Sequence, residues 1–559
     1  KIRIFLISSV VLFLAAIFMT VVRGAALALI VSVLIYLFLE RKRLFKLTDK
    51  KLFFSSIISL TVVFFFLLPH LSQYRPIERL TNFSLNQPTV QQRITVWKVA
   101  WQGIKERPFL GGGPENFSIV FSEHYNSKIL SFGEEVFDRA HNLIFDILAG
   151  QGFLGLLWWL VLIVCLFRVF IKSKNYLFCS LIVAYLIHNF FFFDLFSSYL
   201  MLFILFGLGI YADNRKENLV PNVPKPQHAF SYISIGMLLS GFVLSVALVF
   251  YANIKPALAN FYSTRGYTLL FKGEGNQGLD YFSKALGNAF WSQNDIYKKL
   301  SESYIDFIYN KPQFLKDEAK EFRIKMLTDM VSWFKKRNQA ENLDYVEPLY
   351  LYRTYRAHTL FVDSSPENKL KTIGILEEGI RKLPKALPLY YNLFDLLLDQ
   401  GEFKKAADLM VKTYGLDKNL ARTKFNMGLA FILINTKPGS RDSKEIDNGF
   451  NIIFESTDSG YQSLEKINSL GKVLEKNKMY TEMLKLYLKL SENDSRYLVS
   501  VSYTYLLLGD RKNAFSFAER ALALNYSQIG NQGFRTLSEI YKALGDNKKR
   551  SEALLKSAR

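Results

Sequence analysis

The hexapeptide FDRAHN at residues 137–142 directly precedes a long apolar segment, LIFDILAGQGFLGLLWWLVLIVCLFRVFI, at residues 143–171. A membrane-spanning helix needs about 20 predominantly apolar residues, and this segment exceeds that length. The hexapeptide therefore places a carboxylate, a guanidinium, an imidazole and an amide at one membrane–water boundary. Ionisable groups are costly beside a bilayer, so this cluster indicates a functional site.

The first half of the chain contains further apolar segments of this kind, and we predict seven spans. These are Ile4–Val22, Gly24–Leu39, Leu52–Leu68, Leu143–Ile171, Tyr176–Phe193, Leu195–Tyr211 and Phe230–Tyr251. The second and sixth are close to the lower length limit of about 17 residues. Because the sequence begins with Lys1 almost directly in a hydrophobic segment, we expect the natural protein to have further residues before it.

Basic residues gather in three short loops between these spans. They are Arg41-Lys42-Arg43 with Lys46, Lys50 and Lys51, then Arg168, Lys172 and Lys174, and finally Arg215 and Lys216. Short loops rich in lysine and arginine lie on the cytoplasmic side, and one threading of the chain satisfies all three loops. That threading predicts that the outer loop, residues 69–140, and everything after Tyr251 are extracytoplasmic.

Composition excludes some function classes. The chain has 559 residues and a net charge of +21, but no compact basic block or nucleic-acid motif accompanies this charge. We therefore expect no nucleic-acid partner. Cys165 and Cys179 both lie inside apolar runs, which gives no sign of a disulfide framework.

The outer loop contains two local patterns. Apolar residues recur at spacings of three and four, which is typical of an amphipathic helix. They are Ile94, Trp97, Trp101 and Ile104. We expect this helix to start at Arg93 and to end before Pro108. The glycines of Gly111-Gly112-Gly113-Pro114 predict a flexible turn, and the alternative is a turn whose backbone amides approach a ligand.

Taken in order, these motifs resemble the O-antigen ligase and polymerase superfamily of bacterial membrane proteins, over roughly residues 1–210. The motifs are Arg23-Gly24-Ala25, Arg93 with Trp97, Gly111-x-Gly113-Pro114-Glu115-Asn116-Phe117, Asp138-Arg139-Ala140-His141-Asn142 and Gly152-x-x-Gly155-Leu156. Members of that superfamily typically have more spans than this chain. The resemblance implies transfer or polymerisation of a glycan on the outer face of the cytoplasmic membrane. The donor would be a polyprenyl-diphosphate-linked glycan, and the acceptor a hydroxyl on a lipid, a glycan or a protein. It also implies that the reaction needs no cofactor and no metal.

The charged residues of these motifs are of types suited to glycan transfer from a diphosphate carrier. Cleavage of a glycosyl–phosphate bond leaves a diphosphate, and arginine presents a planar, permanently charged fork to phosphate oxygens. The candidates for binding the donor diphosphate are Arg23, Arg93 and Arg139. The acceptor hydroxyl needs a base, for which His141, Asp138 and Glu115 are alternatives. His141 can instead donate a proton to the diphosphate, and Arg93 is a catalytic candidate as well.

Each of these residues also has a structural interpretation. Arg23 can anchor a helix end at lipid headgroups, Arg93 can cap or salt-bridge its own helix, and Asp138 can pair with Arg139. We expect Asn142 to cap the following helix rather than to take part in catalysis, since asparagine is a favoured N-cap. His188 and Asp194 lie near the predicted outer face and either support the acceptor site or form a local hydrogen-bonded pair.

The second half of the chain has a recurring pattern of short helices. Leu508-Gly509-Asp510 and Leu544-Gly545-Asp546 are followed by alanines, and Gly401 and Gly273 begin earlier copies. This pattern is similar to the tetratricopeptide repeat, in which helix pairs stack into a solenoid with a concave surface. We predict an all-α protein with a polytopic membrane domain at residues 1–253 and an extracytoplasmic repeat domain at residues 254–559.

Two alternatives to a lipid-linked O-antigen ligase or polymerase stay open. One is a protein O-oligosaccharyltransferase. The other is a non-catalytic membrane scaffold whose repeat domain recruits proteins of envelope assembly. In every case we expect contact with membrane lipid and, on the repeat domain, a protein partner.

Overall fold

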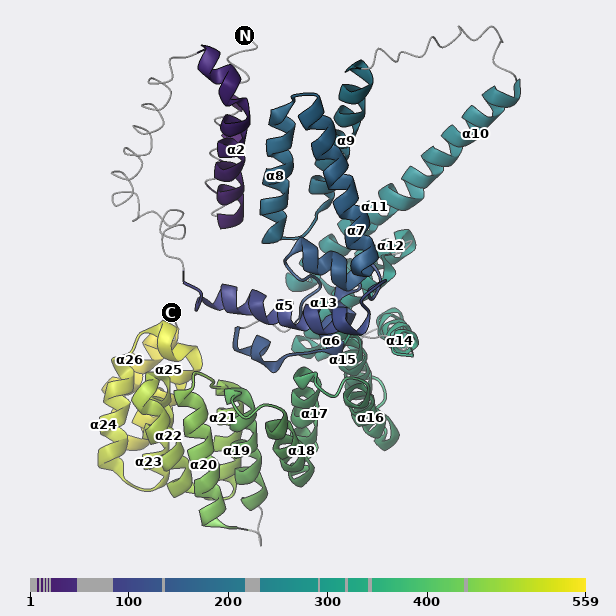
Figure 1. Ribbon diagram of the computed structural model, residues 1–559. Helices are drawn as coiled ribbons and strands as arrows, with labels where there is room; N and C mark the ends of the chain where they lie inside the picture. Colours follow the sequence, from purple (N-terminus) through teal and green to yellow (C-terminus); the bar gives the residue numbers. More distant parts are fainter. Residues whose placement is uncertain are drawn as a thin grey trace. The chain divides into compact units, whose positions relative to one another are not determined.

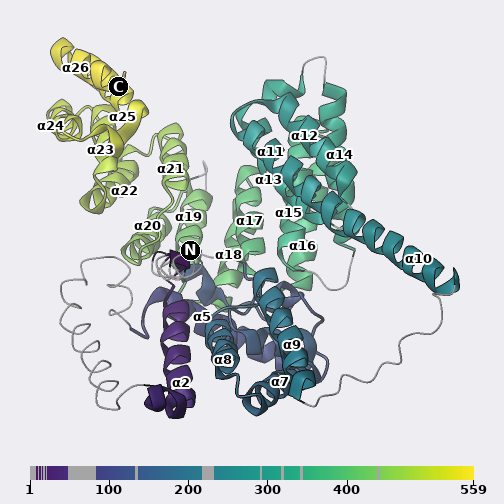
Figure 2. The same cartoon turned by 90° about the horizontal axis from the view of Figure 1, so that it is seen from above.

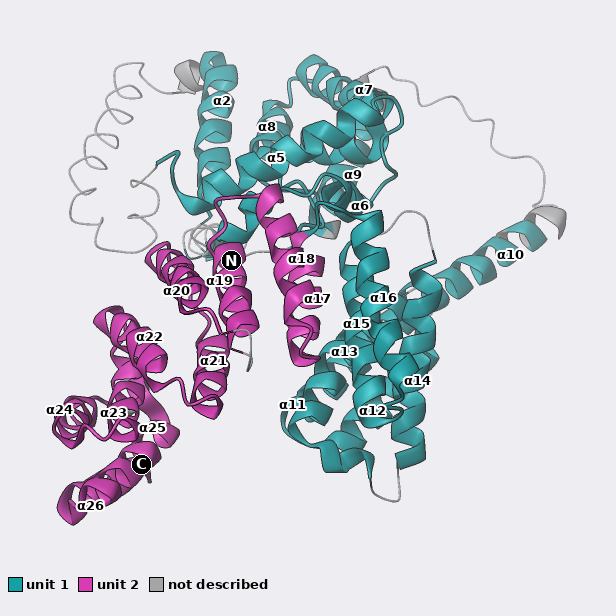
Figure 3. Ribbon diagram, turned by 90° about the horizontal axis from the view of Figure 1, so that it is seen from below, with its two compact units in different colours: residues 1–386 teal, residues 387–559 magenta. Residues whose placement is uncertain are grey.

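The computed structural model describes residues 22–47, 84–132, 136–216, 232–289, 292–316, 320–339, 344–436 and 441–558, together with isolated positions between 8 and 19. Helices connected by turns account for these residues, and no strand occurs among them, which agrees with the all-α prediction (Figure 1). The chain forms two compact units, residues 1–386 and residues 387–559, which Figure 3 shows in different colours.

Among the described residues of unit 1, three helical segments are long and apolar enough to cross a membrane. They are Arg23–Arg43, Leu143–Lys172 and Leu239–Phe271, and the shorter apolar helices are Tyr176–Phe190 and Ser197–Tyr211. These segments point to a membrane protein. The predicted span Leu52–Leu68 lies outside the described residues, as does Ile4–Val22 except for isolated positions.

Four of the apolar helices that the structure describes in unit 1 pack together. They are α2 (Arg23–Leu47), α7 (Leu143–Lys172), α8 (Tyr176–Phe190) and α9 (Phe196–Lys216). Helix α2 packs against α8, and α7 packs against both α8 and α9 (Figure 1). Their shared core includes Phe170, Cys179 and Ile182. Helix α2 continues past its predicted end at Leu39 through the basic residues that follow, because these residues also favour helix.

The outer loop folds into α5 (Pro88–Glu106), α6 (Phe117–Glu123) and the 3-10 helix η1 (Ser127–Phe132). The prediction that the first helix starts at Arg93 was wrong. It starts at Pro88, where proline suits the first turn because its missing N–H would have no partner there. The predicted apolar stripe was also shifted. Val96, Val99, Ala100 and Ile104 are buried, whereas Trp101 is 45% exposed.

The glycine turn and helix α7 exchange backbone hydrogen bonds. Gly152 has φ 66° and interrupts α7, which leaves helical carbonyl and amide groups without their usual partners. Gly112 N donates to Ala149 O at 2.7 Å, and Gly113 N donates to Gly150 O at 2.8 Å. In return, Phe153 N donates to Pro108 O at 2.8 Å. A Cβ on Gly152 would lie 2.2 Å from Phe109 O, so this close approach requires glycine.

The last apolar helix of unit 1 passes directly into the helical second half of the chain. Helix α10 (Tyr232–Val249), the π-helical turn η2 (Phe250–Ile254) and α11 (Lys255–Phe271) are continuous. The helix therefore continues past the predicted end of the span at Tyr251, through the π-helical turn and Pro256, which lies in the first turn of α11. The predicted domain boundary between residues 253 and 254 falls inside this helical stretch, whereas the division between compact units falls after Ala386.

The rest of unit 1 is made of α12 (Gly275–Asn288), α13 (Gln293–Asn310), η3 (Pro312–Leu315), α14 (Lys320–Arg337), α15 (Val346–Phe361) and α16 (Pro366–Lys382). Figure 2 shows α11–α16 as a group of neighbouring helices, with α11 packed against α12 and α13. Their shared core includes Phe282, Tyr304 and Phe334.

Unit 2 is a succession of short helices. They are α17 (Leu387–Asp399), α18 (Phe403–Leu416), α19 (Ala421–Asn435), α20 (Ser443–Asp458), α21 (Leu464–Lys476), α22 (Tyr480–Asn493), η4 (Ser495–Tyr497), α23 (Leu498–Leu507), α24 (Arg511–Leu522), α25 (Tyr526–Leu544) and α26 (Asn547–Ser557). Helices adjacent in the chain contact each other, for example α19 with α20 and α25 with α26 (Figure 3).

The turn glycines of the predicted repeats share one type of backbone conformation. The turn glycines Gly273, Gly401, Gly509 and Gly545 all have positive φ, which ends one helix and lets the chain turn into the next. The alanines that follow them are buried where helices cross; examples are Ala285, Ala406, Ala518 and Ala553. Side chains larger than alanine would separate these helices.

Candidate functional site

The FDRAHN segment ends in a helix cap. Asn142 Oδ1 accepts hydrogen bonds from Ile144 N at 2.9 Å and Phe145 N at 3.1 Å, so Asn142 is the N-cap of α7. Its Nδ2 donates to Phe190 O at 2.8 Å, at the end of α8. The expectation that Asn142 caps the helix agrees with this geometry. The cap also holds the start of α7 against the end of α8.

His141 lies just before this cap in an unusual backbone conformation. Its φ is 52°, in the left-handed region that residues other than glycine seldom adopt. Its imidazole contacts the rings of Phe137, Phe192 and Phe193, with centroid distances of 5.8, 6.2 and 5.3 Å. Strained backbone in folded proteins gathers at functional sites, where the surrounding structure stabilises it.

Asp146, in the first turn of α7, is a site residue that the sequence analysis missed. Its Oδ1 accepts a hydrogen bond from Ala140 N at 2.6 Å, and its Oδ2 is buried without a hydrogen-bond partner in the described structure. The carboxylate therefore holds the backbone between Arg139 and His141 in place. The available signal was a lone carboxylate inside an apolar segment, which is by itself a functional hypothesis.

Helix α5 contacts the same segment from another side. Trp97 Nε1 donates to Ala140 O at 3.0 Å, and the Trp97 ring stacks on Phe145 at 5.7 Å between centroids. Arg93 lies four residues earlier, so it shares this face of α5. It is half-buried, and burial lowers its pKa, although arginine stays protonated.

Arg93 has no hydrogen bond or ion pair in the part of the chain that the structure describes. It lies in the second turn of α5, so it does not cap the helix. Among the described residues, Arg93 therefore neither caps the helix nor forms a salt bridge. A half-buried guanidinium without a counter-charge is suited to binding an anion.

Arg139 forms an ion pair with Glu115 rather than with Asp138. Burial lowers the pKa of Arg139, but the hydrogen bond and the charge of Glu115 outweigh it, so the net pKa is raised. Glu115 also has a positive φ, 64°, directly after the glycine–proline turn. Asp138 is exposed. The ion pair thus joins the glycine turn to the FDRAHN segment.

The remaining predicted site residues are Arg23, His188 and Asp194. Arg23 is the first residue of α2, and its Nη1 donates to Gln87 Oε1 at 2.8 Å, at the start of α5. Asp194 is buried, and Tyr185, Asn189 and Ser198 donate hydrogen bonds to it at 2.7–2.8 Å. His188 contacts the Phe192 ring at 5.8 Å between centroids, and no hydrogen bond joins it to Asp194 among the described residues.

The glycine turn is not a cradle of free backbone amides. The amides of Gly112 and Gly113 donate to the carbonyls of Ala149 and Gly150 in α7, so they are not available to a ligand. The turn instead places Glu115 next to Arg139. Of the two interpretations of this motif, the structural one agrees with the geometry.

The outer loop also contacts the helical region that follows α10 within unit 1. Tyr345 N donates to Ser122 Oγ at 3.1 Å, and the Tyr345 ring makes an edge contact with Tyr125 at 5.4 Å between centroids. Both tyrosines are buried, with exposed fractions of 1% and 4%. Desolvation also raises the pKa of the neighbouring Asp344.

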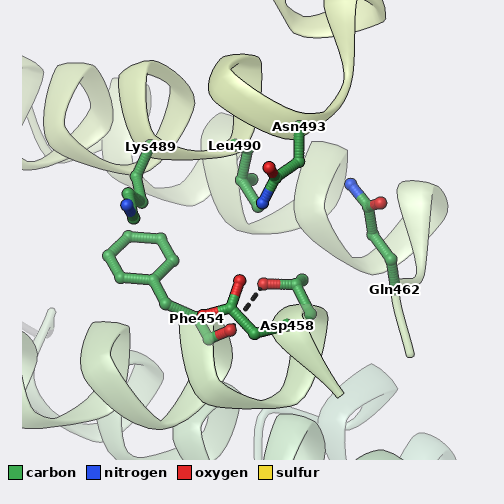
Figure 4. A pocket seen from close by; sticks show the side chains of 7 residues that line it. Phe454, Asp458, Gln462, Lys489, Leu490 and Asn493 are labelled. Carbon is green, nitrogen blue, oxygen red and sulfur yellow. Dashed lines mark hydrogen bonds between the residues drawn. The ribbon is translucent and has the colours of Figure 1, made fainter. Parts of the chain in front are cut away.

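Unit 2 contains a separate small pocket between α20, α22 and the turn that follows α20. It is lined by Phe454, Thr457, Asp458, Gln462, Lys489, Leu490 and Asn493. Figure 4 shows the aromatic ring of Phe454 below Lys489 and the amide of Asn493 facing Asp458. None of the predicted site residues lines this pocket.

Comparison with known proteins finds a family model that matches part of the chain. Residues 8–160 match the family model described as O-antigen ligase. This match includes the FDRAHN segment, Arg93 and the glycine turn, and it supports glycan transfer of the ligase or polymerase type at the level of the family. No curated protein matches the chain.

Proposed function

We propose that the chain transfers or polymerises a glycan from a polyprenyl-diphosphate carrier to a hydroxyl acceptor. The observation that carries this proposal is the half-buried Arg93, which has no counter-charge among the described residues and shares a face of α5 with Trp97. Through Trp97 this face contacts the backbone beside His141. An anion bound there would lie near a histidine whose backbone is held in a left-handed conformation.

The reaction forms a bond between the acceptor oxygen and the anomeric carbon of the donor. The bond from that carbon to the diphosphate oxygen breaks, and the diphosphate departs with the electron pair. Fixed cations stabilise the charge that develops on it. We assign Arg93 to the diphosphate as the main contact, with Arg23 and Arg139 as further cations.

The acceptor proton needs a base, and we assign this role to His141. Glu115 already neutralises Arg139, and Asp138 is exposed, so both are less suited to accept a proton from a positioned hydroxyl. Asp146 acts as a positioning residue, because its carboxylate holds the Ala140 amide. Asn142, His188 and Asp194 support the arrangement of the helix ends around the acceptor.

The proposal also includes the orientation of the chain in the membrane. The positive-inside pattern favours an outer face that carries the FDRAHN segment, and a repeat domain of tetratricopeptide type on the same side. The contact between Tyr345 and Ser122 agrees with this, since it requires the outer loop and the helical region to share one compartment. The helical region would then position an acceptor or a protein partner.

An in vitro transfer assay tests the function directly. The full chain in lipid vesicles, supplied with a polyprenyl-diphosphate-linked glycan and a hydroxyl acceptor, is expected to release polyprenyl diphosphate in step with glycosylated acceptor. Lipid, glycan and protein acceptors, supplied separately, distinguish ligase, polymerase and protein O-glycosylation. Absence of turnover with all three acceptors, in protein that is folded, would favour the scaffold alternative.

Labelling with an impermeant thiol reagent tests the orientation. In a background with Cys165 and Cys179 replaced by serine, a cysteine at the exposed Ser131 or Ser516 is expected to react in intact cells. A cysteine at the exposed Lys172, the last residue of α7, is expected to react only after the membrane is opened. The reverse pattern would invert the proposed topology.

A further inference from the structure

The C-terminal ends of α5 and α6 bring together three potential metal ligands. They are Glu106, the last residue of α5, and Glu123 and His124 at the end of α6. The imidazole nitrogen and the two carboxylate oxygens lie within 4.8 Å of one another. None of the three was singled out by the sequence pattern, and none belongs to the residues around His141.

The burial of His124 distinguishes this cluster from an ordinary pair of surface carboxylates. It is 8% exposed, and its Nε2 is buried with no hydrogen-bond partner in the described structure. That nitrogen lies 3.3 Å from Glu106 Oε2. A neutral imidazole nitrogen facing carboxylate oxygens is favourable only when a proton or a cation lies between them.

The His124–Glu106 pair has the spacing of two ligands on one metal ion. Two ligand atoms about 2.1 Å from a tetrahedral zinc ion lie about 3.4 Å apart, close to the observed nitrogen–oxygen distance of 3.3 Å. The close approach of the two helices depends on Gly103, where a Cβ would lie 2.2 Å from Val120 Cγ1 and 3.6 Å from His124 Cδ2. The helix crossing thus holds the imidazole against the end of α5.

The electrostatics also favour a cation. Helix C-termini carry partial negative charge, and two of them end at this cluster. Arg107 Nη2 lies 3.1 Å from Glu123 Oε1 and neutralises one of the two carboxylates. Its side chain is 40% exposed, so it can turn to solvent when Glu123 rotates toward an ion. With a neutral His124, the cluster retains a net negative charge even with Arg107 in place.

We propose that Glu106, Glu123 and His124 bind a divalent transition metal ion, with Zn²⁺ as the best-matched ion and water completing its coordination. Imidazole together with carboxylates suits zinc better than magnesium or calcium, which prefer oxygen ligands alone. The ion would fasten α5 to α6 and so fix the helix that carries Arg93. This role is structural and is independent of the proposed transfer reaction.

Zinc binding to the full chain tests this proposal. We expect the purified protein in detergent, without a histidine tag and with both cysteines replaced by serine, to bind about one Zn²⁺ per chain after treatment with chelator. Added Zn²⁺ should raise the thermal unfolding midpoint, because a ligand that binds only the folded state stabilises it. His124→Gln, Glu106→Gln and Glu123→Gln should each weaken zinc binding by at least about tenfold.

Matched controls identify the site. His358→Gln and Glu321→Gln change the same residue types in the helical region outside the cluster, and they should bind Zn²⁺ like the parent protein. If the parent protein takes up no Zn²⁺, or if the three cluster variants bind it as the controls do, the proposal is wrong. In that case, a protonated His124 paired with Glu106 accounts for the geometry.

Discussion

Replacement of Arg93 by alanine is expected to reduce glycan transfer by on the order of a hundredfold, while the protein remains folded and inserted. The guanidinium is half-buried and without a partner among the described residues, so its removal breaks no ion pair that stabilises the fold. Loss of a charge-assisted contact to the departing diphosphate costs about 3 kcal/mol, which corresponds to that reduction in rate. The measurement is release of polyprenyl diphosphate, normalised to folded protein.

Two further variants make this result specific. Arg93→Lys is expected to recover little activity, because an ammonium group cannot reproduce the two-pronged contact of a guanidinium with phosphate. Lys98→Ala removes an exposed cation from the same helix and should leave the rate unchanged. Full normalised activity in Arg93→Ala, or equal losses in Arg93→Ala and Lys98→Ala, would contradict the assignment.

Replacement of His141 by asparagine is expected to lower the transfer rate by about 10²- to 10⁴-fold, the usual contribution of a general base. Asparagine tolerates the left-handed conformation better than most residues, so this variant keeps the backbone at φ 52° while it removes the base. Alanine would combine loss of the base with backbone strain. Rates are measured over a range of pH and normalised to folded protein.

The pH dependence separates catalysis from structure at His141. If the His141 imidazole accepts the proton of the acceptor hydroxyl, the transfer rate of the parent protein falls at acidic pH, where histidine is protonated. The His141→Asn variant should not show this fall. His358→Asn, in the helical region, serves as the matched control and should keep the parental profile. An unchanged profile in His141→Asn, with only a lower yield of folded protein, would show that His141 has a structural role.

Local signals made the helices around the site predictable. The start of α7 was correct to the residue, because an asparagine cap directly precedes a continuous apolar segment. The turn glycines of the helical region were likewise recognisable, since positive φ after a short helix favours glycine. The predicted start of α5 was wrong because the helix begins at Pro88, and its buried face is shifted because Trp97 contacts the FDRAHN segment and Trp101 is exposed.

Contacts between distant residues could not be derived in this way. A pair between Arg139 and its neighbour Asp138 was one of two interpretations of these residues, but Arg139 pairs with Glu115, 24 positions away, because the glycine turn is held against α7. Asp146 lies inside a predicted apolar span and was not among the candidate site residues, yet its carboxylate accepts a hydrogen bond from the Ala140 amide. The glycine turn and Gly152 were read as separate motifs, and the structure joins them by hydrogen bonds across the α7 kink.

The sequence by itself determined the helical class, the apolar segments, the Asn142 cap and the chemical types of the candidate site residues, because each depends on composition or on spacing within a few turns of chain. Only the tertiary structure decided which charges meet. It pairs Arg139 with Glu115, leaves Arg93 without a counter-charge among the described residues, and places His124 against Glu106. The physical reason is that side-chain partners are set by how helices cross, and helix crossings depend on close approaches at glycines such as Gly103 and Gly152, which meet segments distant from them in sequence.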